Sequence, residues 1–114
     1  MLPADRRIAA LNREATRLAQ PIIDAGGEIA GNARHDGALA RVNAIGSELN
    51  ALVRAAAARS IRDGKLVALL GGDHAVSFGA IEAACATWKG LGLLHFDAHA
   101  DLRTAYEGFT WSHA

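Results

Sequence analysis

The chain has 114 residues, which is enough for one small domain with a modest core. Its hydrophobic share of 51% and charged share of 21% are those of an ordinary soluble globular protein. Lys and Arg together number 12, as do Asp and Glu, so the net charge of zero gives no electrostatic basis for binding nucleic acid or an anionic membrane.

The same counts indicate a cellular compartment. No apolar run approaches the ~20 residues that a membrane span requires, and the N-terminus lacks the apolar core of a signal peptide. Cys85 is the only cysteine, so an internal disulfide is excluded and a reducing environment is favoured. We therefore expect a cytoplasmic protein without nucleic-acid or membrane partners.

The first third of the chain predicts a helix, a short strand and a loop. Apolar residues recur at helical spacing from Ile8 to Leu18, and Pro21 is expected to end this helix. Residues 22–23 then predict a short strand that an Asp and a Gly-Gly pair close. Residues 30–37 predict a loop.

The rest of the chain predicts two buried strands separated by helices. A long amphipathic helix is expected to end at Asp63-Gly64, and its apolar stripe consists of Leu39, Val42, Ile45, Leu49, Leu52 and Ala56. Residues 66–70 and 91–96 are continuous apolar runs, which is typical of strands buried on both faces. A helix over 75–88 connects them. This alternation predicts an α/β fold in three layers, α/β/α, around a parallel sheet.

Polar side chains follow the second apolar run. Asp97, His99 and Asp101 are spaced at i, i+2 and i+4, which places them on one face of an extended strand. Two carboxylates and an imidazole repel or lose hydration there unless a cation lies between them, and a divalent metal is the simplest such cation. His74 follows the other run and can reach the same edge, because ligands bind at the carboxyl ends of parallel strands. The alternative is a solvated strand end with helix-capping carboxylates.

These motifs carry a resemblance to a known family. GGDHA at 71–75, followed by DAHAD at 97–101, resembles the metal-binding signature of the ureohydrolases, the family of arginase and agmatinase. Residues 22–29 and 106–114 extend the resemblance more weakly. It implies an arginase-like fold of which residues 1–114 are a part, truncated at both ends. The family's first strand and its later Asp-x-Asp metal segment are not in the sequence.

The resemblance implies the chemistry and the roles of single residues. It implies hydrolysis of linear amidines or guanidino compounds by a hydroxide held between two Mn²⁺ ions, with release of urea. Asp97 would bridge both ions, His74 and Asp101 would bind one, and His99 would bind the other. His113 matches a histidine that shuttles protons to the leaving amine, and imidazoles exchange protons near neutral pH. The intact protein would be a homo-oligomer acting on a small guanidino substrate, and this segment alone would be inactive.

Several alternatives remain open from the sequence. Residues 102–114 are poor in the Asn, Ser and Thr that grip an amino-acid head group, which favours an agmatinase-like substrate over arginine or formimidoylglutamate. A non-catalytic member of the fold, acting as an interaction module, is a second hypothesis. An unrelated metal hydrolase such as a phosphoesterase is disfavoured by GGDHA. The coding sequence after Ala114 would distinguish the first two hypotheses.

Three neighbouring residues are given structural interpretations. Asp73 is expected to cap the helix that follows it or to hydrogen-bond one of the metal ligands, rather than to bind metal itself. His95 lies one step deeper in the strand than the metal residues, and a hydrogen-bonded core histidine is the favoured interpretation. For His113 a simple surface position is the alternative to proton transfer.

Overall fold

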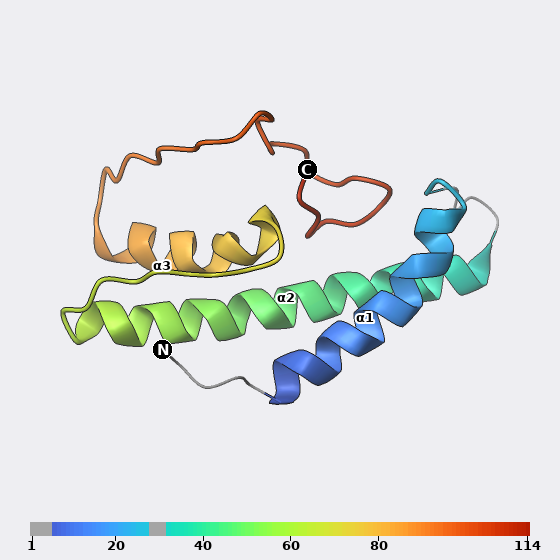
Figure 1. Ribbon diagram of the computed structural model, residues 1–114, viewed down its shortest axis with the longest axis horizontal. Coiled ribbons are helices and arrows are strands. Elements are labelled where there is room, and N and C mark those ends of the chain that lie inside the picture. The colour runs from blue at the N-terminus through green and yellow to red at the C-terminus, as the bar shows by residue number, and fades with distance from the viewer. Residues whose placement is uncertain (1–5, 28–31) are drawn as a thin grey trace.

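The computed structural model describes residues 6–27 and 32–114 (Figure 1). Its elements in chain order are α1 (Arg6–Asp24), α2 (Ala33–Arg62), the short 3₁₀-helix η1 (His74–Ser77) and α3 (Phe78–Thr87). The long helix α2 is the centre of the arrangement, since α1, η1 and α3 all pack against it. None of the helices in residues 6–27 and 32–114 is long and apolar enough to cross a membrane.

Helix α1 runs further than the sequence predicts. The expectation that Pro21 ends the helix, with a strand at residues 22–23, is wrong, because α1 continues through Pro21 to Asp24. Proline removes one N–H donor, but its own carbonyl still accepts from Ala25 N at 3.3 Å. The added turn brings Ile22 to 0% exposure, so burial of an apolar side chain offsets the lost bond.

Helix α2 has a defined start and end. The side chain of Asn32 accepts hydrogen bonds from the backbone N–H groups of Arg34 at 3.2 Å and His35 at 3.3 Å, as N-cap residues do. The predicted loop at 30–37 is therefore wrong from residue 33 onward, while residues 30–31 lie outside the described residues. The predicted end is confirmed: Asp63 is the C-cap and Gly64 adopts φ +68°.

Helix α3 packs closely on α2. Gly79 is buried, and a Cβ at this position would overlap the carbonyl oxygen of Asn50 and lie 2.9 Å from the backbone nitrogen of Arg54. The side chain of Asn50, itself buried, accepts from Gly79 N at 3.3 Å. The helix predicted over 75–88 is confirmed, with a 3₁₀ turn as its first part.

The predicted sheet is not observed in the part of the chain that the structure describes. Residues 66–70 and 91–96 are extended but belong to no strand, and Figure 1 shows that both run antiparallel to α3. Their side chains are exposed: Leu66 is 102% accessible and Leu70 is 98% accessible. A parallel strand needs a backbone partner and covered faces, and these two runs have neither. The α/β/α layering therefore stays an expectation from the sequence.

Candidate metal centre

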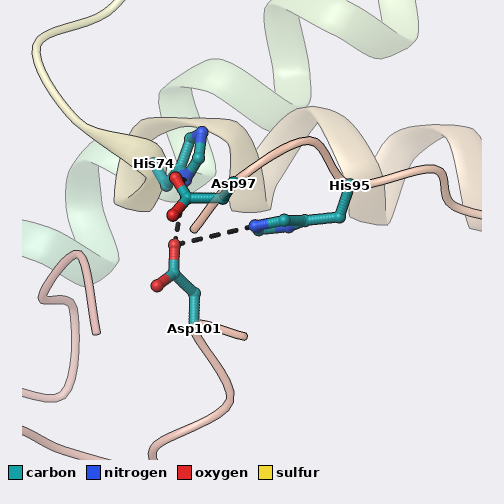
Figure 2. A group of neighbouring side chains, drawn as sticks. All are labelled: His74, His95, Asp97 and Asp101. Carbon is teal, nitrogen blue, oxygen red and sulfur yellow. Dashed lines mark hydrogen bonds and ion pairs between the residues drawn. The ribbon is translucent and has the colours of Figure 1, made fainter. Parts of the chain in front are cut away.

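Four side chains converge where the two extended segments end (Figure 2). His74 begins η1, directly after the first extended segment. His95 comes from the second segment, Asp97 directly follows it, and Asp101 comes from the loop after it. One ligand atom from each of the four lies within 4.8 Å of all the others.

His74 is the contact point between the two carboxylates. Its Nδ1 lies 2.9 Å from Oδ2 of Asp101 and 3.0 Å from Oδ2 of Asp97. Nε2 of His95 lies 3.9 Å from the same Asp101 oxygen, and the two imidazole rings meet edge to face at 5.0 Å. Asp101 is the most enclosed of the group, with a side chain 15% exposed.

Local backbone geometry orients the two carboxylates. The backbone N–H of His99 donates to Oδ1 of Asp97 at 2.8 Å, which leaves Oδ2 facing the cluster. Asp101 has φ +51°, in the left-handed region that aspartate tolerates better than most residues. The expected straight strand through 97–101 is wrong, because residues 97–99 form bends. The carboxylates converge through these bends rather than through strand alternation.

The histidine content of the cluster differs from the expectation. His99 points outward with a side chain 83% exposed, and its Nδ1 lies 3.3 Å from Oδ1 of Asp97. His95, expected in the core, is an exposed residue with a side chain 35% accessible, and it belongs to the cluster instead. Its position two residues before Asp97, on the same face of an extended segment, was the signal in the sequence.

Asp73 does not perform the predicted capping. It precedes η1 as the N-cap residue, but its side chain makes no capping hydrogen bond. Asp73 instead lies with His74 at the border of an open depression in the surface, and its negative charge acts on His74.

The electrostatics of the cluster favour a positive charge. The hydrogen bond that Nδ1 of His74 makes to Asp101 raises the pKa of His74 above its ordinary value, and the negative charges of Asp97, Asp101 and Asp73 act in the same direction. The hydrogen bond from the backbone of His99, helped by the charge of His74, lowers the pKa of Asp97. Protonated His74 is a cation placed between these two carboxylates.

The chemistry of the donors fits a divalent metal ion. Two imidazole nitrogens and two carboxylates form a mixed nitrogen and oxygen set, and such sets bind ions such as Mn²⁺, Fe²⁺ or Zn²⁺. A divalent ion would replace the proton of His74 as the positive charge between Asp97 and Asp101. The cluster can therefore hold a metal ion.

His113 stands at the edge of the same site. An open depression of about 520 Å³ is bordered by His74, Asp97, His99, Asp101 and His113, with the turn at residues 70–73 on its other side. The imidazole of His113 is exposed, and its ring centroid lies 6.0 Å from that of Tyr106.

Comparison with known proteins gives the class of this chain. The sequence model of the arginase family matches residues 7–114. The chain therefore belongs to the arginase family.

Individual relatives carry the names of a ureohydrolase, an agmatinase and an arginase. The chain is 41% identical over 73 residues to an N(1)-aminopropylagmatine ureohydrolase of Thermus thermophilus, covering 64% of this chain and 25% of the relative. It is 43% identical over 54 residues to an agmatinase of Bacillus subtilis, covering 47% and 19%. An arginase of Bacillus caldovelox is 30% identical over 110 residues, covering 92% and 36%.

These matches also show how much of a relative's length the chain covers. The aligned part of the chain spans about a quarter of the Thermus relative's length. The comparison with solved structures gave no significant match.

Proposed function

We propose that the intact protein is a metal-dependent ureohydrolase that cleaves a C–N bond of a linear guanidino compound and releases urea. The observation that carries this proposal is the convergence of His74, His95, Asp97 and Asp101 in a chain of the arginase family. Two Mn²⁺ ions are the proposed cofactors, with His74, Asp97, Asp101 and, at the exposed edge, His99 among their ligands.

The residues have separate tasks in this proposal. A bound divalent ion lowers the pKa of water and polarises the guanidino group, which is otherwise a poor electrophile. The backbone N–H of His99 holds Asp97 in its orientation. His113 borders the depression without belonging to the cluster. We assign to its imidazole the transfer of a proton to the leaving amine nitrogen.

The substrate is proposed to lack an α-carboxylate. The agmatine-type relatives are 41% and 43% identical to the chain over their matched segments, and the arginase is 30% identical over a longer one. Residues 102–114 offer few of the amide and hydroxyl groups that would hold an amino-acid head group. Agmatine and N(1)-aminopropylagmatine are thus the first compounds to test.

A substrate panel tests the proposal. The intact protein, supplied with Mn²⁺, is incubated separately with agmatine, N(1)-aminopropylagmatine, guanidinobutyrate and arginine, and urea is measured. We expect urea from an agmatine-type compound, with kcat/KM at least about tenfold above that for arginine, a difference of about 1.4 kcal/mol. Preference for arginine would overturn the substrate assignment. Release of urea from none of the four would overturn the enzymatic assignment and favour an interaction module.

A further inference from the structure

The segment that carries His113 is a closed loop. The backbone N–H of Arg103 donates to the carbonyl of Ala114 at 3.0 Å, which joins the two ends of residues 103–114. Within it, Tyr106 and Phe109 exchange two backbone hydrogen bonds of 3.1 and 2.9 Å across a two-residue turn. The turn residues, Glu107 and Gly108, have φ +51° and +80°, as a tight hairpin of this kind requires.

Helix α2 holds this loop through one amide side chain. Asn43 donates from Nδ2 to the carbonyl of Gly108 at 3.1 Å and accepts at Oδ1 from the N–H of Thr110 at 3.0 Å. The side chain thus pairs with the loop as a neighbouring strand would. Only the asparagine amide offers this donor and this acceptor together, because a carboxylate has no donor.

A second attachment lies one helical turn further along α2. Nε1 of Trp111 donates to Oγ of Ser47 at 2.9 Å, and its ring meets Phe78 edge to face at 5.0 Å. Gly46 allows the approach, since a Cβ there would lie 2.7 Å from Cγ of Trp111. Residues 43, 46 and 47 share one face of the helix, so a single stripe of small and polar residues makes all these contacts.

The two attachments and the loop closure determine where His113 stands. His113 lies between Trp111, which is fixed to α2, and Ala114, which is fixed to Arg103 only two residues after Asp101. We propose that Asn43 is a positioning residue: through the closed loop 103–114, helix α2 places His113 at the edge of the candidate metal centre. This inference rests on the proposed function, because it assigns a task to a residue that touches neither metal nor substrate.

The test compares variants of the intact protein with Mn²⁺ supplied. Asn43→Ala removes both loop contacts and should lower kcat for agmatine about tenfold, since small displacements of reacting groups cost 10- to 100-fold. Metal content should be unchanged, and KM should change less than kcat. Ser47→Ala removes the Trp111 bond, together with the bond from Oγ of Ser47 to the carbonyl of Asn43 within α2, and should lower kcat in the same direction by a smaller factor. Asn12→Ala, at an exposed asparagine on α1 whose side chain bonds to none of the described residues, is the control and should keep wild-type kcat.

A double variant separates positioning from general destabilisation. His113→Asn alone should lower kcat about 100-fold, as the loss of a proton-transfer group does. If Asn43 acts through His113, adding Asn43→Ala to His113→Asn should lower kcat no further. Multiplicative losses in the double variant, or wild-type kcat in Asn43→Ala, would overturn the inference, as would wild-type kcat in His113→Asn.

Amide hydrogen exchange distinguishes this inference from the proposed function. Asn43→Ala should speed exchange across residues 103–114 while the amides of α2 and α3 stay protected. If the wild-type protein releases no urea, the proposed function fails and this assignment to catalysis fails with it, whatever the exchange shows. If urea is released and exchange in residues 103–114 is unchanged by Asn43→Ala, the positioning role alone is wrong.

Discussion

His74 is placed where its protonation and metal binding compete. Its Nδ1 faces two carboxylate oxygens at 2.9 and 3.0 Å, and these contacts raise the pKa of His74 above 6.5. A raised histidine pKa contributes stability that is complete below the unfolded-state value and is lost as pH rises through the folded-state value. The pKa of Asp97 is lowered, so its contribution to stability is present above the ordinary value of 3.8 and is lost as pH falls from there through the lowered value.

The metal-free protein should therefore lose stability as pH rises from the ordinary histidine pKa through the raised folded-state pKa of His74. The loss should be small, because the side chain is 48% exposed and the ion pair is screened by water. Apparent Mn²⁺ affinity should change in the opposite sense and rise over the same range, because the ion requires a neutral imidazole.

The measurement is the free energy of unfolding of the metal-free protein, determined by urea denaturation at one pH below the ordinary histidine pKa and at one pH above the raised pKa of His74. His74→Asn is the control and should show a smaller difference between the two pH values than the wild type. Equal differences in the two proteins would show that the Asp101 contact does not hold a proton on His74.

The sequence predicted some of the cluster and missed one part of it. His74, Asp97 and Asp101 were expected together, and the structure brings them together. His95 was assigned to the core because burial was judged from a strand with neighbours on both faces. In the observed extended segment its side chain faces Asp101 instead. The outward turn of His99 depends on the bends at 97–99, for which the sequence spacing gave no signal.

Helix α2 is the scaffold for every element near the site. Its face at 43, 46 and 47 holds the loop 103–114, and the next turn receives α3 through Gly79. The contact at Gly79 is between two backbones, since the neighbours of a Cβ there would be Asn50 O and Arg54 N. Main-chain atoms cannot rotate away as a flexible side chain can, so this approach depends on glycine.

Gly79→Ala should therefore destabilise the intact protein by about 1–3 kcal/mol through overpacking, although alanine is the better helix former. Gly37→Ala is the matched control, because Gly37 also lies within a helix and its added Cβ would meet no atom within 4 Å. That variant should be stabilised by about 0.5–1 kcal/mol. Urea denaturation of both variants gives the comparison. A stabilised Gly79→Ala protein would mean that α3 does not approach α2 as closely as described.

Periodicity predicted α2 and α3, while the strands expected at 66–70 and 91–96 are not observed in the described residues, for a physical reason. The helical hydrogen bonds of α2 and α3 close within each segment, so the pattern of one segment suffices. The strands expected at 66–70 and 91–96 depend on partners elsewhere in the chain, and their apolar pattern says nothing about whether those partners are present. The strand predicted at residues 22–23 is wrong for another reason, since two consecutive isoleucines also fit a helical turn that buries Ile22 and leaves Ile23 49% exposed.

The whole molecule shows large apolar side chains at its surface. Leu70, Leu94 and Phe96 are each more than three-quarters exposed. An unpaired extended segment with apolar side chains invites pairing with further strands. The aligned segment spans about a quarter of the Thermus relative's length. Cytoplasmic location and homo-oligomeric assembly stay predictions.

The measurement that most directly tests the proposed metal-dependent hydrolysis is bound Mn²⁺ per chain, determined together with urea release from agmatine. The account predicts that chelation abolishes urea release, that Mn²⁺ restores it, and that Asp97→Ala loses both metal and activity. Asp63→Ala, at an exposed carboxylate whose ion pair is with Lys65, should keep both. Wild-type metal content and turnover in Asp97→Ala would contradict the assignment of the centre to His74, Asp97 and Asp101.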